Sequence, residues 1–187
     1  SAYLTDRSDA VALMVLAHQT EAHNRMTQAA YGTLRALRDE KIRDDALGEP
    51  TKPGEHSEST NSRIKSSWEP LVEYLLFSNE APLTAPISGD PGFVSEVIAR
   101  VPRYVKCRSL RDFDLKTRLF RYPCSYLIES QSFEGLPEET KTYVRRRIFE
   151  VLSGKDNSKP YAHLSAADRA DTLDVLRQTD SAFRALR

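Results

Sequence analysis

Residues 8–47 read SDAVALMVLAHQTEAHNRMTQAAYGTLRALRDEKIRDDAL, and their pattern decides the fold. Hydrophobic residues in this segment recur at three- and four-residue steps, which is the spacing of one face of an α-helix. The stripe comprises Val11, Val15, His18, Ala22, Met26, Ala29, Ala30, Leu34 and Leu37. Thr5 or Ser8 can cap the N-terminus, and no helix breaker follows before Gly48. The pattern predicts a helix of about 35–40 residues, roughly 55 Å long, as the spine of the fold.

The rest of the chain predicts shorter helices separated by polar or proline-rich loops. We expect them at about 60–78, 93–100, 109–121, 123–129, 137–152 and 165–178. Ser109 and Ser165 each begin a segment with capping-box spacing. Pro70 predicts a kink or a new segment within the second helix. Clear period-2 alternation is hard to find. The sequence therefore predicts an all-α single domain over residues 1–187, an irregular helical bundle around one long N-terminal helix.

Composition and missing motifs argue against several classes of protein. Lys and Arg total 27, as do Asp and Glu, so the net charge is zero, unlike that of a dedicated nucleic-acid binder. No run of 18 apolar residues predicts a membrane span. The chain has no haem-attachment motif, zinc-spaced cysteine pair, phosphate loop, Gly-x-Ser-x-Gly or paired Glu-x-x-His. It also lacks an initiator Met and a signal-peptide pattern, so we expect a fragment of a larger protein.

A polar cluster from His18 to Asn24 interrupts the long helix. His18 lies on the hydrophobic stripe and can share a face with Glu21, whereas His23 lies about 140° away, so the two imidazoles do not suit one metal. One interpretation makes His18 a general base oriented by Glu21. The other makes His18 a core residue that a neighbouring group satisfies. The helix geometry favours the structural role for His18, and it makes His23 and Asn24 the better candidates for binding something outside the chain.

The segment from Arg100 to Arg121 is strongly basic, with eight Lys and Arg residues against two Asp. Such a segment suits carboxylates, phosphates or an acidic partner, because guanidinium groups bind them in a bidentate manner. Within it, the candidate binding residues are Arg103, Arg108, Arg111, Arg118 and Arg121. In an enzyme, Arg111 or Arg118 would hold an anionic substrate. The alternative is intramolecular pairing with acidic helices elsewhere in the chain.

The remaining candidate residues are two cysteines and two histidines. Cys107 and Cys124 can pair in an oxidising compartment or remain free thiols. Cys124 near a helix N-terminus could be reactive, but the hydrophobic residues around it favour a buried packing role. His56 and His163 fit solvated or capping positions. No metal site is expected.

Several strings together resemble the C-terminal region of larger uncharacterised bacterial exported proteins. They are residues 3–9, 15–24, 71–77, 109–127 and 150–154. Those proteins carry c-type cytochrome-like sequence upstream. The resemblance implies a periplasmic or otherwise exported location, and a helical module that packs beside other, haem-bearing domains of a parent protein. This chain lacks a haem-attachment motif, so any haem would be covalently bound elsewhere in that protein or held here non-covalently, with its propionates on the basic segment.

These observations favour a helical accessory or interaction domain over a self-sufficient enzyme. The first alternative is an enzyme with an acid–base site at His18 and Glu21 beside an Arg-lined anion pocket. The second alternative is a purely structural helical scaffold.

Overall fold

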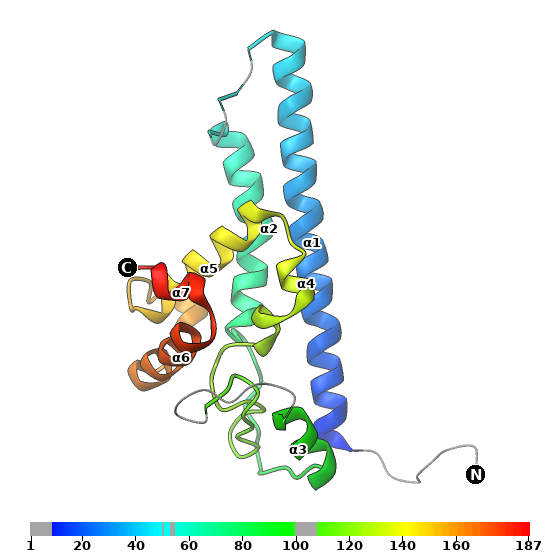
Figure 1. The fold of residues 1–187 in the computed structure, drawn as a ribbon, viewed down its shortest axis with the longest axis vertical. Coiled ribbons are helices and arrows are strands. Elements are labelled where there is room, and N and C mark those ends of the chain that lie inside the picture. Colours follow the sequence, from blue (N-terminus) through cyan, green and yellow to red (C-terminus); the bar gives the residue numbers. More distant parts are fainter. Residues whose placement is uncertain (1–8, 50, 53–54, 100–107) are drawn as a thin grey trace, which may run out of the picture.

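The computed structural model describes residues 9–49, 51–52, 55–99 and 108–187. Its α-helices are α1 (Ala10–Leu47), α2 (Glu58–Leu75), α3 (Pro91–Ala99), α4 (Gln131–Glu134), α5 (Glu138–Leu152), α6 (Ala166–Thr179) and α7 (Ser181–Ala185). There are also two short 3-10 helices, η1 (Tyr126–Glu129) between α3 and α4 and η2 (Lys159–Tyr161) between α5 and α6. The described residues form no strand, only an isolated bridge between Phe113 and Phe120. The predicted all-α fold around a long N-terminal helix is confirmed (Figure 1).

Helix α1 has 38 residues, as the long predicted pattern requires. The residue before it, Asp9, caps it by accepting the Ala12 backbone N–H at 2.9 Å. The prediction that Thr5 or Ser8 caps the helix was therefore wrong. At the other end Gly48 adopts a left-handed φ of 67°, a conformation that glycine permits without strain.

The inner face of α1, which is the buried one, follows the predicted hydrophobic stripe, and Leu34 is the exception. Its buried members are Val11, Val15, His18, Ala22, Met26, Ala29, Thr33, Ala36 and Glu40. Leu34, predicted as a core residue, is 54% exposed. Beyond Ala29 the helix presents Thr33 and Ala36 to α2, because those positions continue the 3.6-residue period from Ala22 and Leu34 falls on the opposite side.

Helices α1 and α2 form an antiparallel hairpin whose upper part rises above the other helices (Figure 1). Gly32 permits the close approach, since a Cβ there would lie 2.5 Å from Ser67 Cβ. Nearby, Trp68 Nε1 of α2 donates to Thr33 Oγ1 at 2.6 Å. Helix α2 continues through Pro70 as one element. The hairpin therefore depends on small residues on α1 and large residues on α2.

Buried Glu40 fastens the upper end of α1 to the segment that begins α2. Its Oε1 accepts the Ser57 backbone N–H at 2.8 Å, and its Oε2 lies 2.7 Å from His56 Nδ1. Burial alone raises the pKa of this carboxyl, but the hydrogen bonds from Ser57 and His56 outweigh it and lower the pKa to about 2. Glu40 is therefore a buried anion that is paired through hydrogen bonds.

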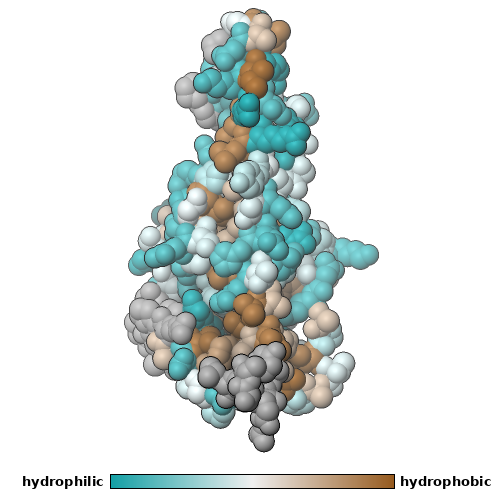
Figure 2. Space-filling model, turned by 90° about the vertical axis from the view of Figure 1, so that its right-hand side faces the viewer, coloured by the Kyte–Doolittle hydropathy of each residue, from teal (hydrophilic) through white to brown (hydrophobic). Residues whose placement is uncertain are grey.

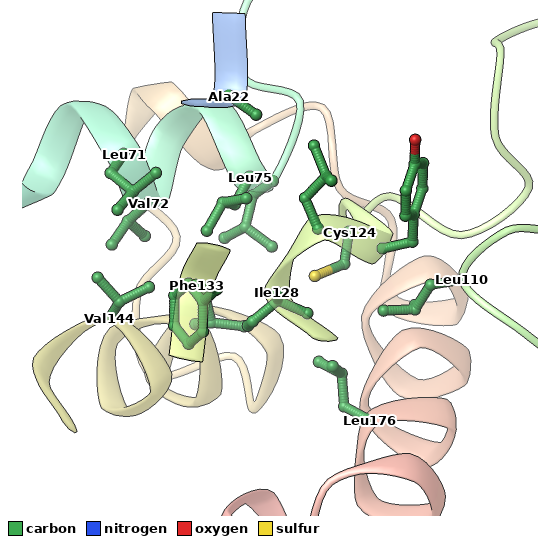
Figure 3. Close-up of a cluster of buried hydrophobic side chains, with 14 of the residues drawn as sticks. Ala22, Leu71, Val72, Leu75, Leu110, Cys124, Ile128, Phe133, Val144 and Leu176 are labelled. Carbon is green, nitrogen blue, oxygen red and sulfur yellow. The ribbon is translucent and has the colours of Figure 1, made fainter. Parts of the chain in front are cut away.

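The main core lies in the lower part of the molecule, where α1 and α2 pack together with α4, α5 and α6. Figure 3 shows Ala22 of α1 and Leu75 of α2 near Ile128 of η1, Phe133 of α4 and Leu176 of α6. All five side chains are buried. Cys124 lies among them, fully buried and unpaired.

Residues 109–121 do not form the predicted helix. Asp114 Oδ2 accepts backbone N–H groups from Thr117 and Arg118, and Leu115 has φ of 59°, so the chain turns back on itself. Phe113 then stacks on Phe120, with ring centroids 5.3 Å apart. Local carboxylate-to-backbone bonds and ring packing here replace the helical hydrogen bonds that the capping-box spacing predicted.

The later helices agree more closely with the sequence. The Ser165–Asp168 capping box begins α6, as predicted, and α5 begins directly after Pro137. The helix predicted for residues 123–129 is reduced to η1, which Ser125 caps, so Pro123 lies before the helix. Within the described ranges, no helix is long and apolar enough to cross a membrane.

Candidate functional site

His18 lies in the core, 7% exposed, with both ring nitrogens hydrogen-bonded. Its Nε2 lies 2.8 Å from Ser125 Oγ, and its Nδ1 lies 3.2 Å from the Tyr74 hydroxyl. The Tyr74 hydroxyl donates to the His18 carbonyl oxygen at 3.3 Å, so it accepts from His18 Nδ1–H. The unprotonated Nε2 therefore accepts from the Ser125 hydroxyl. Burial lowers the pKa of His18 to about 4, so this network holds a neutral imidazole.

Glu21 does not pair with His18, contrary to the predicted acid–base arrangement. Its Oε1 instead accepts from Arg25 Nε at 2.7 Å, one helical turn further along α1. The groups that contact the imidazole are the hydroxyls of Ser125 and Tyr74, which come from segments far away in the sequence. His18 therefore lacks the orienting carboxylate that a general base of this kind needs.

Two hollows of about 410 Å³ each lie on either side of the segment Phe77–Glu80. The first touches His18, Glu21 and Tyr74, and the second is lined by Arg118, Lys159 and His163. Phe77 and Asn79 have φ of 56° and 63°. Such angles are uncommon for a bulky residue like Phe77, so the wall between the hollows holds a strained backbone position.

Two arginines of the basic segment, Arg108 and Arg118, form ion pairs within the chain. Arg108 contacts Asp171 at 3.1 Å and also Asp174, while Arg118 contacts Asp168 at 2.9 Å. All three carboxylates belong to α6, the kind of acidic helix that the intramolecular alternative requires.

The other basic candidates are arranged differently. The Arg111 guanidinium lies 4.0 Å from the Tyr126 ring centroid, a cation–π contact beside the His18 network. Arg121 lies 5.7 Å from the Tyr122 ring and is exposed. Arg103 lies outside the described residues. A role for these residues in binding a partner stays a prediction.

His23 and Asn24 are both exposed on α1, as the helix geometry predicted. His23 Nδ1 donates to the Gln19 carbonyl oxygen at 2.6 Å, so its Nε2 accepts from the Ser132 hydroxyl of α4 at 2.9 Å. This bond holds α4 against the flank of α1. The predicted contact of these residues with a partner remains untested.

These contacts do not fit haem ligation by His18, His23, His163 or Cys124. His18, His23 and His163 each have both ring nitrogens within hydrogen-bond distance of protein atoms. Burial raises the pKa of the Cys124 thiol, which therefore stays protonated and is not the reactive thiol of the alternative interpretation. No group of three metal-ligating side chains occurs in the part of the chain that the structure describes. Cys107 lies outside that part.

The outer face of α1 carries an unusual concentration of exposed hydrophobic residues. All six large hydrophobic side chains that the described part of the chain exposes belong to this helix. Five of them lie on its outer face, namely Leu13, Leu16, Tyr31, Leu34 and Ile42, whereas Leu47 lies at the C-terminal end on the side of the buried stripe. Their exposed fractions range from 54% to 70%. Figure 2, which views the molecule from the α1 side, shows hydrophobic patches at intervals down the narrow upper part.

Two shallow hollows follow this outer face. One, of about 370 Å³, lies between α1 and α4 and is lined by Thr27, Tyr31, Leu34 and Ser132 among others. The next, of about 470 Å³, extends from Tyr31 to Ile42. The sequence-based reading missed this surface because it placed Leu34 in the core. The second series of large hydrophobic residues, opposite the first, was the signal that could have revealed it.

The chain matches no protein-family model, no curated protein and no solved structure.

Proposed function

We propose that this chain is a helical interaction domain that binds another protein through the outer face of α1. The observation that carries the proposal is the restriction of all the exposed large hydrophobic side chains of the described residues to this one helix. Exposed hydrophobic residues scattered singly are ordinary, but a row of them with adjoining hollows is typical of a protein-binding surface. Helices that bind other helices use the same three- and four-residue spacing.

The contacts of His18 favour this proposal over the enzyme. A neutral imidazole with two hydroxyl partners and no carboxylate supports the fold rather than proton transfer. The outer face of α1 in turn favours a binding role over a purely structural scaffold, since nothing in a scaffold role calls for an exposed hydrophobic row.

The resemblance described above adds a wider setting to the proposal. In that setting the chain is an exported, periplasmic accessory domain, and its partners include other domains of a larger redox protein. Any haem would be held by those other domains, because His18, His23 and His163 of this chain are engaged in its own hydrogen bonds.

Site-specific photocrosslinking in the source cells tests the interaction proposal. A photoreactive amino acid at Leu34 of α1 should give a covalent adduct with a protein, and Tyr31→Asp in the same chain should abolish that adduct. The matched control places the same group at Arg146 of α5, whose side chain is 72% exposed but lies away from the hydrophobic row. No protein adduct at Leu34, or an equal yield at Arg146, contradicts the proposal.

A second candidate function is binding of a small anion in the hollow beside Phe77. Lys159, His163 and Arg118, which also pairs with Asp168, line this hollow together with Glu80. The strained φ of Phe77 lies in its wall. Inorganic phosphate at constant ionic strength should then raise the melting temperature of the protein, and Lys159→Met should remove the increase. An equal increase in both proteins, or none in either, contradicts this candidate.

A further inference from the structure

The outer face of α1 has a regular stripe of its own, opposite the buried one. Leu13, Leu16, Thr20, Thr27, Tyr31 and Leu34 recur at steps of three, four or seven residues, and each is exposed. At 3.6 residues per turn they lie on the side of the helix opposite Ala22 and Ala29, which face the core. From Leu13 to Leu34 the stripe runs about 32 Å at 1.5 Å per residue.

The order of large hydrophobic and threonine positions in this stripe is the same in both directions. Its midpoint lies between His23 and Asn24, and residues equally distant from that point match in chemistry. Leu13 corresponds to Leu34, Leu16 to Tyr31, and Thr20 to Thr27. A twofold axis through the midpoint, perpendicular to the helix, would therefore place each member of the stripe opposite its counterpart on a second copy. Twofold interfaces have this self-complementary form, in which residue i contacts j and j contacts i.

The charges at the two ends follow the same symmetry. Asp9 and Arg38 are also equally distant from the midpoint, and both lie on the side of the stripe. Arg38 is exposed, and the Asp9 carboxylate is partly exposed. Asp9 Oδ1 accepts the Ala12 backbone N–H and Oδ2 accepts the Asp90 backbone N–H, and each oxygen keeps a second lone pair for a further donor. An antiparallel pair brings each Arg38 to the Asp9 of the other copy. A parallel pair would place like charges opposite each other.

We infer that the occupant of the outer face of α1 is a second copy of this chain, bound antiparallel along α1. This inference rests on the proposed function and names the partner. The hollow lined by Tyr31 and Leu34 receives Leu16 and Leu13 of the second copy. His23 and Asn24 meet their counterparts at the twofold axis, where a polar residue sets the register of a helix pair. The contact is short and has a polar middle, so it belongs to the small, reversible class of interface.

Sedimentation of the purified chain over a range of concentrations tests this inference. The wild-type protein should change reversibly from monomer to dimer as its concentration rises through the micromolar range. Leu34→Asp should weaken the dimer at least tenfold. Leu47→Asp is the matched control, because Leu47 is 65% exposed on the same helix but lies off the stripe, and it should leave the dissociation constant unchanged. Unchanged circular dichroism and melting temperature at low concentration show that each variant folds.

A mixing experiment tests the antiparallel arrangement. Chains with Leu13→Lys and chains with Leu34→Glu should each dimerise poorly alone. Mixed in equal amounts they should form a tighter heterodimer, because the introduced Lys and Glu face each other only when the helices run antiparallel.

Three results overturn the inference: a wild-type chain that stays monomeric at high micromolar concentration, equal effects of Leu34→Asp and Leu47→Asp, or no gain on mixing. The photocrosslink at Leu34 separates the two proposals. An adduct with a different protein overturns only the second copy as partner, whereas the absence of any protein adduct contradicts the interaction domain itself.

Discussion

The two faces of α1 have the same helical spacing but opposite side-chain sizes. The inner face, which is buried, consists mainly of small or polar residues such as Ala22, Ala29 and Thr33. The outer face carries the large ones, including Leu16 and Tyr31. In the α1–α2 hairpin, large side chains of α2 fill the interface between the two helices. The small residues on α1 allow α2 to pack closely against it. The stripe of a helix with the larger hydrophobic residues is therefore not always the one that faces the core.

The largest expected change in the free energy of unfolding comes from truncating a leucine that is buried against the inner face of α1. Leu71 of α2 is fully buried against the inner side of the hairpin, and Leu71→Ala should lower the free energy of unfolding by about 2–5 kcal/mol through lost burial and a new cavity. Urea unfolding measures this effect. A loss below about 1 kcal/mol would show that the interface between α1 and α2 is not tightly packed.

Lowering the pH should destabilise the protein through His18, which lies on the inner face of α1. An unfolded histidine binds its proton near pH 6.5, whereas burial lowers the pKa of His18 to about 4. Between these pH values the unfolded state binds more protons, so stability falls as pH falls, by about 3 kcal/mol across the window. His18→Gln should remove this component. Unfolding free energies of both proteins, measured from pH 7 to pH 4, should therefore converge on acidification. Parallel curves would falsify the neutral, buried state of His18.

A smaller change tests how closely the two helices of the hairpin approach. Gly32→Ala places a Cβ against Ser67, which should cost about 1–3 kcal/mol of strain, partly offset by about 1 kcal/mol of helix propensity. Gly32→Ala should cost less stability in a chain that also carries Ser67→Gly, because Ser67→Gly removes the side-chain atoms that the new Cβ contacts. The effects of the two substitutions on the unfolding free energy should therefore be non-additive. If Gly32→Ala stabilises the protein in thermal unfolding, the helices are further apart than described.

The smallest effect should come from the outer face. Leu16 is 58% exposed, so Leu16→Gln should change the unfolding free energy by less than about 0.5 kcal/mol in dilute protein. Only at concentrations where chains associate should wild type gain stability over this variant, since binding to the folded state stabilises it. A large loss at high dilution would mean that Leu16 is packed within its own chain.

Sequence reasoning predicted the parts of this fold that depend on long, regular periodicity. The length of α1, the buried position of His18 and the capping box of α6 all follow from local spacing. It failed for residues 109–121, where a carboxylate turn at Asp114 competes with the helix.

The candidate sites were harder to predict because their partners are distant in sequence. His18 forms hydrogen bonds with Ser125 and Tyr74, and Arg108 forms ion pairs with α6. Residue spacing along one helix could not identify these partners. The stripe on the outer face of α1 is visible in the sequence. Its exposure could be established only once the position of α2 was known, which is why Leu34 was assigned to the core.

The rise of the α1–α2 hairpin above the other helices has a consequence for motion (Figure 1). Around Ala22 the helix is held within the main core. Beyond Ala36 it contacts α2 and is held by hydrogen bonds of Glu40, Arg43 and Asp44 to the segment between the two helices. Amide hydrogens near Ala22 should exchange with solvent only when the whole domain unfolds, while those near Leu47 exchange through local opening. One unbroken helix thus belongs to two cooperative units, and their boundary lies along its length.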